Sequence, residues 1–291
     1  MKIIRIIKEM KAVARELKSE GKTIGFVPTM GYLHEGHISL VKKSVQMADV
    51  AIVSIFVNPT QFGPREDFKE YPRDIKRDLE ILEREGVDFV FFPDENEMYP
   101  NGYKTYIEVH DLDKKLCGRS RPGHFKGVCT VVLKLFNIVD PDMAFFGQKD
   151  AQQAIILKKM IEDLDLDVRL HVLPIVRDKD GLALSSRNEY LNPEERKAAL
   201  VLRRSLQKAK EMIKEGERKV PRIIQRMMEI IGKEPLARVD YVEIVDLDEL
   251  NSPDIIEKRD TLIALAVFMG KTRLIDNMMV KIKNREVKFM E

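Results

Sequence analysis

The segment Thr23-Ile-Gly-Phe-Val-Pro-Thr-Met-Gly-Tyr-Leu-His-Glu-Gly-His-Ile-Ser-Leu40 decides the fold of this chain. It opens with a short apolar run, Ile24 to Val27, and then breaks at Pro28 and Gly31. An amphipathic run with apolar residues at helical spacing follows, from Ile38 to Met47. This order predicts a strand, a tight turn and a helix.

Two histidines, His34 and His37, lie at the predicted turn with Gly36 between them. The amino end of a helix attracts phosphate through its backbone N–H groups and its dipole. Glycine allows a ligand to approach the backbone, and imidazoles can donate hydrogen bonds to phosphoryl oxygens. The segment therefore favours a nucleotide site, although a strand–helix corner with two surface histidines would fit the same string.

Beyond this segment, apolar runs alternate with amphipathic runs up to about residue 175. The expected strands are 23–27, 50–57, 88–92, 143–146 and 167–174, with an edge strand at 105–109. The expected helices are 4–20, 38–47, 74–85, a helix that starts at 125 or 127 and ends at 139, and 151–164. Such alternation predicts an α/β fold with a doubly wound parallel sheet.

The pattern changes after Val176. Two helices are expected, at 192–215 and 220–231, followed by strands at 237–245, 261–269 and 272–279. Helices followed by strands indicate a smaller α+β domain. We therefore expect two domains, 1–176 and 177–291.

The composition excludes several classes of protein. The chain has 291 residues and a formal net charge of +2, from 50 basic and 48 acidic residues, so no nucleic-acid footprint is expected. Two cysteines, Cys117 and Cys129, are too few for a zinc site and are expected to be reduced. No signal peptide or membrane-spanning run is recognisable, which favours the cytoplasm.

Three more polar loops follow predicted strands or the domain boundary. They are Asn58–Gln61, the run Gly147-Gln-Lys-Asp150 with Gln152 and Gln153, and Ser185-Ser-Arg187. Lys149 and the Ser185–Arg187 loop suit phosphate, and amides suit a hydroxyl or carboxylate. Each loop could also be an ordinary turn or a helix cap. The roles of Arg119, Arg121 and His124 stay open.

No residue has the context of a protein nucleophile, and neither Gly-x-Gly-x-x-Gly nor a Walker loop is present. These absences disfavour a dehydrogenase and a P-loop kinase. The remaining class is a reaction at a phosphate chain in which the protein positions the reactants and stabilises the developing charge. Attack at an α-phosphate with pyrophosphate leaving is one such reaction.

His34-Glu-Gly-His37 is similar to the His-Ile-Gly-His signature of class I aminoacyl-tRNA synthetases and related nucleotidyltransferases. The complete set of motifs resembles the pantoate–β-alanine ligase family. That set comprises Pro28–His37, Phe56-Val-Asn-Pro-Thr-Gln-Phe-Gly63, Arg121-Pro-Gly-His-Phe-Lys-Gly-Val128, Phe145–Gln153 and Leu184-Ser-Ser-Arg-Asn188.

The resemblance implies a reaction. Pantoate and ATP form pantoyl adenylate and pyrophosphate, and the amine of β-alanine then gives pantothenate and AMP. Magnesium accompanies the ATP. The family implies a cytoplasmic homodimer with a Rossmann-like N-terminal domain and a smaller, mobile C-terminal domain, with no nucleic-acid or membrane partner.

The resemblance also implies residue roles. His34, His37 and Lys149 would stabilise the phosphates as the adenylate forms, with His37 as a proton donor. Gln61, Gln153 and the neighbouring Asn58 would form the substrate-binding part of the site. The ATP site would comprise Met30, Gly31, Tyr32, Leu33, His34, Glu35, Gly36, His37, Gly147, Gln148, Lys149, Asp150, Val176, Leu184, Ser185, Ser186 and Arg187.

Four positions depart from the family pattern: Thr60, Gln148, Ala151 and Leu184. None removes a charge assigned to phosphate. The metal ligand is unknown, and Asp78 is one carboxylate that could assist.

Two alternatives remain. A nucleotidyltransferase acting on a cofactor precursor would keep the histidine pair without needing Gln61 and Gln153. A non-catalytic, RNA-binding relative of a synthetase would need a basic face, which the balanced charge disfavours.

Overall fold

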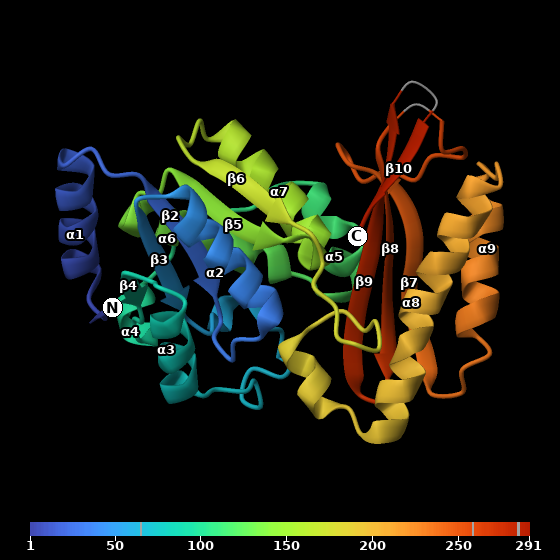
Figure 1. Ribbon diagram of the computed structural model, residues 1–291, viewed down its shortest axis with the longest axis horizontal. Coiled ribbons are helices and arrows are strands. Elements are labelled where there is room, and N and C mark those ends of the chain that lie inside the picture. The colour runs from blue at the N-terminus through green and yellow to red at the C-terminus, as the bar shows by residue number, and fades with distance from the viewer. Residues whose placement is uncertain (65, 258, 284–285) are drawn as a thin grey trace. The chain divides into compact units, whose positions relative to one another are not determined.

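The computed structural model describes residues 1–64, 66–257, 259–283 and 286–291, which form two compact units (Figure 1). The first unit comprises residues 1–113, 121–147 and 156–173. The second comprises residues 114–120, 148–155 and 174–291. Each unit is built on a sheet of its own.

The first unit contains a six-stranded sheet in which every pairing is parallel. Its strands are β1 (Lys2–Ile4), β2 (Ile24–Thr29), β3 (Val50–Ile55), β4 (Phe89–Phe91), β5 (Met143–Gly147) and β6 (Arg169–Leu173). The order is β1-β4-β3-β2-β5-β6, so the direction of winding reverses between β2 and β5. In open α/β sheets, ligands bind at the carboxyl ends of the strands beside such a reversal.

Helices cover both faces of this sheet because its central strands are apolar on both faces. Val27 belongs to the core cluster that includes Ile38, Val41 and Leu82 of α2 and α3. Phe26, the preceding residue, faces the opposite side, where its ring meets Phe136 of α6 edge-on at 6.4 Å. The helices are α1 (Ile7–Ser19), α2 (Glu35–Met47), α3 (Ile75–Arg84), α4 (Glu95–Met98), α6 (His124–Val139) and α7 (Ala151–Asp163), with η1 (Pro59–Gln61) and η2 (Leu112–Lys114) as 3-10 turns.

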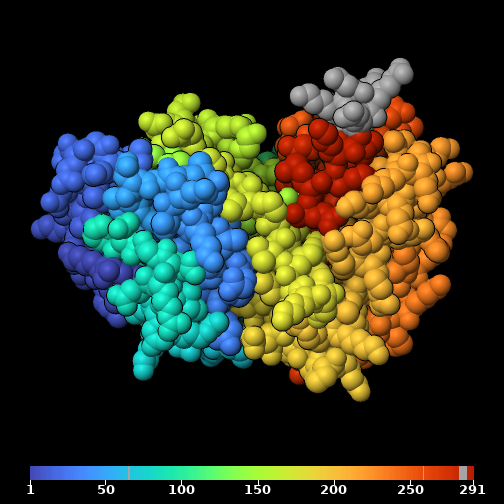
Figure 2. All heavy atoms as spheres, viewed as in Figure 1, coloured from blue at the N-terminus to red at the C-terminus, as the bar shows by residue number. Residues whose placement is uncertain are grey.

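The second unit contains a four-stranded antiparallel sheet of order β10-β9-β8-β7. Its strands are β7 (Ala237–Asp246), β8 (Thr261–Met269), β9 (Thr272–Lys283) and β10 (Glu286–Met290). Helices α8 (Pro193–Lys214) and α9 (Val220–Ile231) pack on one face and form a continuous outer layer there (Figure 2). The remaining short elements are α5 (Cys117–Ser120), η3 (Gln148–Asp150) and η4 (Ser186–Tyr190).

The predicted fold class is confirmed: a doubly wound parallel sheet with a smaller α+β part. The edge strand expected at 105–109 is wrong, because the Ile107 amide donates to the Thr130 hydroxyl at 2.9 Å and not to a neighbouring strand. Sequence analysis also missed β1, too short to show a period, and β10. Among the described residues, no helix is long and apolar enough to cross a membrane.

Each unit is made of three separate segments of the chain, so no single boundary divides them. Residues 114–120 and 148–155 group with the C-terminal sheet, because their polar groups bond to its strands. The division into domains 1–176 and 177–291 stays a prediction.

Candidate active site

The two histidines lie at the amino end of α2, directly after the turn that follows β2. His34 is the N-cap, and its Nδ1 accepts the Gly36 amide at 3.1 Å. The Nδ1 of His37 accepts the His34 amide at 3.3 Å, which completes a reciprocal cap. Because both Nδ1 atoms are acceptors, a neutral imidazole carries its proton on Nε2. The cap therefore holds the two rings 4.0 Å apart, each with Nε2–H as a donor.

The turn between β2 and α2 is held from inside the protein. Gly31 and Tyr32 both have positive φ, 78° and 49°. A Cβ at Gly31 would lie 3.0 Å from Asp78 Oδ2, a tight contact, and its backbone conformation is one that residues with a side chain rarely adopt, so this position favours glycine. The Tyr32 and Leu33 amides donate to the Asp78 carboxylate at 2.7 and 2.8 Å, and the Gly31 amide donates to Thr29 Oγ1 at 3.1 Å. All three amides therefore donate to side-chain oxygens of the protein, and Gly31 permits the backbone conformation that the tight turn requires.

Asp78 itself is almost completely buried on α3. Burial raises the pKa of its carboxyl, whereas the two amide hydrogen bonds act in the opposite direction. Both of its oxygens accept backbone amides. Asp78 is therefore an anchor for the turn, a role that sequence analysis missed when it considered this residue for a metal.

The Asn58–Gln61 loop forms η1 at the end of β3, beside the Met30 side chain. Asn58 is 1% exposed, and its amide donates to Gln61 Oε1 at 3.0 Å and to the Gly127 carbonyl at 3.1 Å. Its own oxygen accepts the Tyr99 hydroxyl at 2.8 Å. Gln61 Nε2 lies 3.2 Å from Met30 Sδ, which brings two predicted site segments together. The contacts of Asn58 thus orient Gln61.

A charged network holds the backbone of Gln61. Its carbonyl lies 2.9 Å from His124 Nδ1 and 3.4 Å from Arg121 Nη2. Arg121 also binds Glu66 through two hydrogen bonds, of 2.8 and 2.6 Å. Burial raises the pKa of the Glu66 carboxyl, but the bonds and charge of Arg121 outweigh burial and lower it. Within the described residues, Arg121 and His124 therefore brace Gln61.

Helix α6 approaches this loop so closely that only glycine fits at position 127. A Cβ there would lie 2.3 Å from the Thr60 carbonyl oxygen and 2.6 Å from the Gln61 nitrogen. Sequence analysis placed Gly127 within a motif but gave it no role. A glycine inside an apolar helix is the signal that could have indicated such a close approach.

The Lys149 segment follows β5. The Gln148 side chain is 2% exposed and donates to the Met290 carbonyl at 2.9 Å. Gln152 accepts the Cys117 amide at 2.9 Å and donates to the Lys115 carbonyl at 2.7 Å. Both glutamines are thus engaged within the second unit, whereas the Lys149 ammonium has an ion pair with Asp150 at 3.6 Å and Gln153 is half-buried.

The segment from Val176 to Arg187 begins as a tight hairpin. The Leu184 amide donates to the Val176 carbonyl at 3.0 Å, and Arg177 is bridged to Ala183. Arg177 also forms a bidentate, buried ion pair with Asp276 of β9, at 2.8 and 2.9 Å. Ser185 then caps η4, with its hydroxyl accepting the Arg187 amide at 3.3 Å. The Arg177–Asp276 ion pair thus fixes the hairpin, and the predicted Ser185–Arg187 segment follows directly after it.

Comparison with known proteins decides the family. Residues 2–279 match one family model, described as pantoate-beta-alanine ligase. The chain belongs to this family. A pantothenate synthetase of Fervidobacterium nodosum is 59% identical over 280 residues, which are 96% of this chain and 99% of that protein. One of Caldicellulosiruptor bescii is 56% identical over 283 residues, or 97% of this chain and 100% of that protein.

Solved structures agree with this assignment. The pantothenate synthetase of Thermus thermophilus superposes with a TM-score of 0.90 at 41% identity, over 95% of this chain and 98% of that chain. The pantoate-beta-alanine ligase of Francisella tularensis, complexed with beta-gamma ATP and beta-alanine, gives a TM-score of 0.76 at 36% identity, over 95% of this chain and 97% of that chain. The predicted resemblance and the predicted enzyme class, a ligase, are confirmed.

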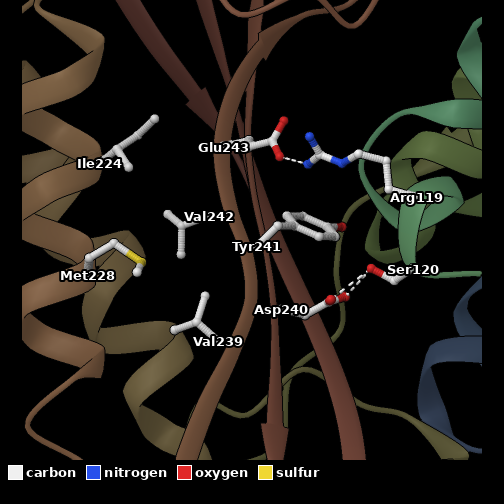
Figure 3. Close-up of a pocket in the computed structure, with 9 residues that line it drawn as sticks. All are labelled: Arg119, Ser120, Ile224, Met228, Val239, Asp240, Tyr241, Val242 and Glu243. Carbon is white, nitrogen blue, oxygen red and sulfur yellow. Dashed lines mark hydrogen bonds and ion pairs between the residues drawn. The ribbon is translucent and has the colours of Figure 1, made fainter.

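A separate cavity of about 610 Å³ lies beside β7 (Figure 3). Its polar side chains are paired with one another, Arg119 with Glu243 and Ser120 with Asp240. Ile224 and Met228 of α9 form an apolar wall opposite. Arg119, whose role the sequence left open, thus takes part in a surface ion pair and not in the predicted site.

Proposed function

We propose that this ligase condenses pantoate with β-alanine in two steps, with ATP as the energy source. The pantoate carboxylate attacks the α-phosphate of ATP, pyrophosphate leaves, and pantoyl adenylate forms. The β-alanine amine then attacks the acyl carbon, which gives pantothenate and AMP. The observation that carries this proposal is the reciprocal His34–His37 cap at the carboxyl end of β2, inside the family match over residues 2–279.

The histidine pair has the geometry needed for the first step. Donors fixed in advance stabilise charge that develops in a transition state without the cost of reorganising them. Each imidazole has its Nδ1 engaged by a backbone amide, so its Nε2–H can point to a phosphoryl oxygen. We assign His37 as the hydrogen-bond donor, through its Nε2–H, to the departing phosphate oxygen, with His34 and Lys149 sharing the charge.

Other parts of the site position the reactants. Gln61 and Gln153 would bind the hydroxyl and carboxylate of pantoate. Gln61 is held in place for this by Asn58, Arg121 and His124. The remaining ATP contacts are assigned to three segments: Met30–His37, Gly147–Asp150, and Val176 with Leu184–Arg187. Holding the pantoate carboxylate in line with the α-phosphate raises the effective concentration of the two reactants. The direct reaction between them can then be fast without a protein nucleophile.

Magnesium is proposed to arrive with ATP. Among the residues that the structure describes, no three His, Cys, Asp or Glu side chains form a metal-binding group. Both oxygens of Asp78 accept amides. Mg²⁺ often keeps waters and binds substrate phosphates, so we place it on the phosphate oxygens of ATP.

The expected setting is a homodimer in the cytoplasm. The family resemblance supports the dimer, and a chain with two buried cysteines and no disulfide between them suits a reducing compartment. No feature of the comparisons favours the alternative nucleotidyltransferase.

A coupled assay tests the reaction. Pyrophosphate release should require pantoate, and pantothenate should form only when β-alanine is added. A panel of other small acids and amines serves as the control. Pyrophosphate release at the full rate without any carboxylic acid would refute the proposal.

A further inference from the structure

Asn277 lies in the middle of β9 and is 3% exposed. Its Nδ2 group donates to two backbone carbonyls, those of Gln148 and Lys149, both at 2.9 Å. Its Oδ1 accepts the Gln148 side-chain amide at 3.3 Å. All three partners belong to the segment that carries Lys149, and the primary amide is engaged at both ends.

The position of Asn277 on the sheet makes this set of bonds unusual. Its neighbour Met278 belongs to the core between the sheet and helices α8 and α9. Successive side chains of a strand point to opposite faces, so Asn277 faces away from those helices. The facing residue on β8 is Ala264, whose small side chain leaves room for the amide. A buried amide is tolerated on such a face only when its hydrogen bonds are satisfied.

The two carbonyls have a particular place in the chain. The Gln148 carbonyl belongs to the peptide before the Lys149 Cα atom, and the Lys149 carbonyl belongs to the peptide after it. Two bonds from one amide group therefore fix both peptide planes around that atom. Because the Cα–Cβ direction follows from these planes, Asn277 sets the direction in which the Lys149 side chain leaves the backbone.

Lysine needs such a constraint more than arginine does. Its ammonium is a point charge on a flexible four-carbon stem, with no planar fork to fix its direction. The Lys149 side chain is 20% exposed, and its Nζ lies 3.6 Å from Asp150 Oδ1. The segment also has an independent anchor, since Gln148 donates to the Met290 carbonyl. The bond from Asn277 to the Lys149 carbonyl is therefore not the sole bond between this segment and the C-terminal strands.

We propose that Asn277 is a positioning residue for catalysis, which aims Lys149 at the phosphates of ATP by holding both peptide groups around it. This inference rests on the proposed phosphate-binding role of Lys149. Asn277 would act through Lys149 and its hydrogen bonds are to the backbone and side chain of the Gln148–Lys149 segment. It is separated from Gln148 by 129 residues and lies in a strand that the predicted motifs do not include.

The test compares Asn277→Asp and Asn277→Ala with Met278→Ala. The aspartate keeps the shape of the side chain but loses both donors, and the alanine removes the group without adding charge. Met278→Ala, at the adjacent position, loses core packing on the other face and serves as the control for stability. The readouts are melting temperature and pantoate-dependent exchange of pyrophosphate into ATP, with the KM for ATP and kcat measured separately.

We expect both Asn277 variants to lower kcat/KM for ATP by about 10- to 100-fold, since a misplacement of about 1 Å can cost that much. Met278→Ala should lose melting temperature and keep the wild-type ATP parameters below its transition. If the variants at 277 change ATP kinetics no more than Met278→Ala does, Asn277 is only structural and the proposal is overturned.

A double-mutant cycle with Lys149→Ala separates this inference from the proposed role of Lys149. If Asn277 acts through Lys149, Asn277→Asp should have little further effect on exchange in the Lys149→Ala background. A full additional loss in that background would overturn the inference and leave the role of Lys149 intact. Wild-type exchange rates in Lys149→Ala would instead refute the role of Lys149. Absence of pantoate-dependent exchange in the wild-type enzyme would refute the proposed function.

Discussion

Gly127→Ala is predicted to impair both folding and pantoate binding, although alanine is the better helix former. In α6 the exchange should gain roughly 0.5–1 kcal/mol in backbone entropy. However, the new Cβ would lie 2.3 Å from the Thr60 carbonyl oxygen and 2.5 Å from its carbon. These are backbone atoms of η1 and cannot rotate away, so α6 and η1 must separate by about 1 Å to reach the ordinary 3.5 Å contact.

Overpacking of this kind costs about 1–3 kcal/mol. The steric cost exceeds the helix gain, so we expect a net loss of about 1–2 kcal/mol in the free energy of unfolding. The same separation moves Gln61 and stretches the bond from Asn58 to the Gly127 carbonyl. A displacement of that size should lower kcat/KM for pantoate by roughly 10- to 100-fold.

Urea unfolding and pantoate-dependent pyrophosphate exchange measure the two effects. Asn137→Ala is the matched control, because Asn137 is exposed on the same helix and the change gains helix propensity without a clash. A Gly127→Ala protein that is stabilised as the control is, with the wild-type kcat/KM for pantoate, would refute the predicted clash between α6 and η1.

Three further predictions concern the groups around this site. Asp78→Asn leaves one buried amide of the Tyr32–Leu33 turn without an acceptor, so the free energy of unfolding in urea should fall by about 1–3 kcal/mol and pyrophosphate exchange should slow. If both quantities are unchanged, Asp78 does not anchor the turn. His37→Ala should slow adenylate formation in single-turnover experiments about 10²- to 10³-fold, the loss typical of removing one oxyanion-hole donor. The circular dichroism spectrum should stay native, and a wild-type rate would refute the role of His37. The lowered pKa of Glu66 predicts that its contribution to stability is complete above its ordinary pKa of 4.5 and is lost as the pH falls through the lower, folded-state value. Unfolding of Glu66→Gln and wild type from pH 7 to pH 3 should therefore show a gap that shrinks only below about pH 4.5, and a gap independent of pH would contradict the ion pair with Arg121.

Much of the parallel sheet could be predicted from local patterns. The strands β2, β3 and β5 are short apolar runs. Helices α3 and α8 have Asp74 and Asn192 as N-caps, the residues at which the predicted ranges 74–85 and 192–215 begin. The error at residues 105–109 has a physical cause. Their apolar residues look like a strand, but a strand needs a neighbour, and the Ile107 amide bonds to a helix side chain.

The candidate site was predictable where one segment contains its own chemistry. The His34–His37 cap needs only four residues, and both of its reciprocal bonds are present. The anchors of the site were not predictable in this way. Asp78 is separated from Leu33 by 45 residues and Asn277 from Gln148 by 129, and neither lies in a motif that indicates its partner.

The sequence alone thus determined the alternation of strands and helices, the family, and the segments expected to meet ATP and pantoate. These properties are local, since they depend on hydrophobic period, caps and contiguous motifs. Only the tertiary structure decided which groups hold those segments in place. Asp78, Gly127 and Asn277 act through buried hydrogen bonds and close packing between distant parts of the chain, and such contacts exist only once the sheets and helices have packed.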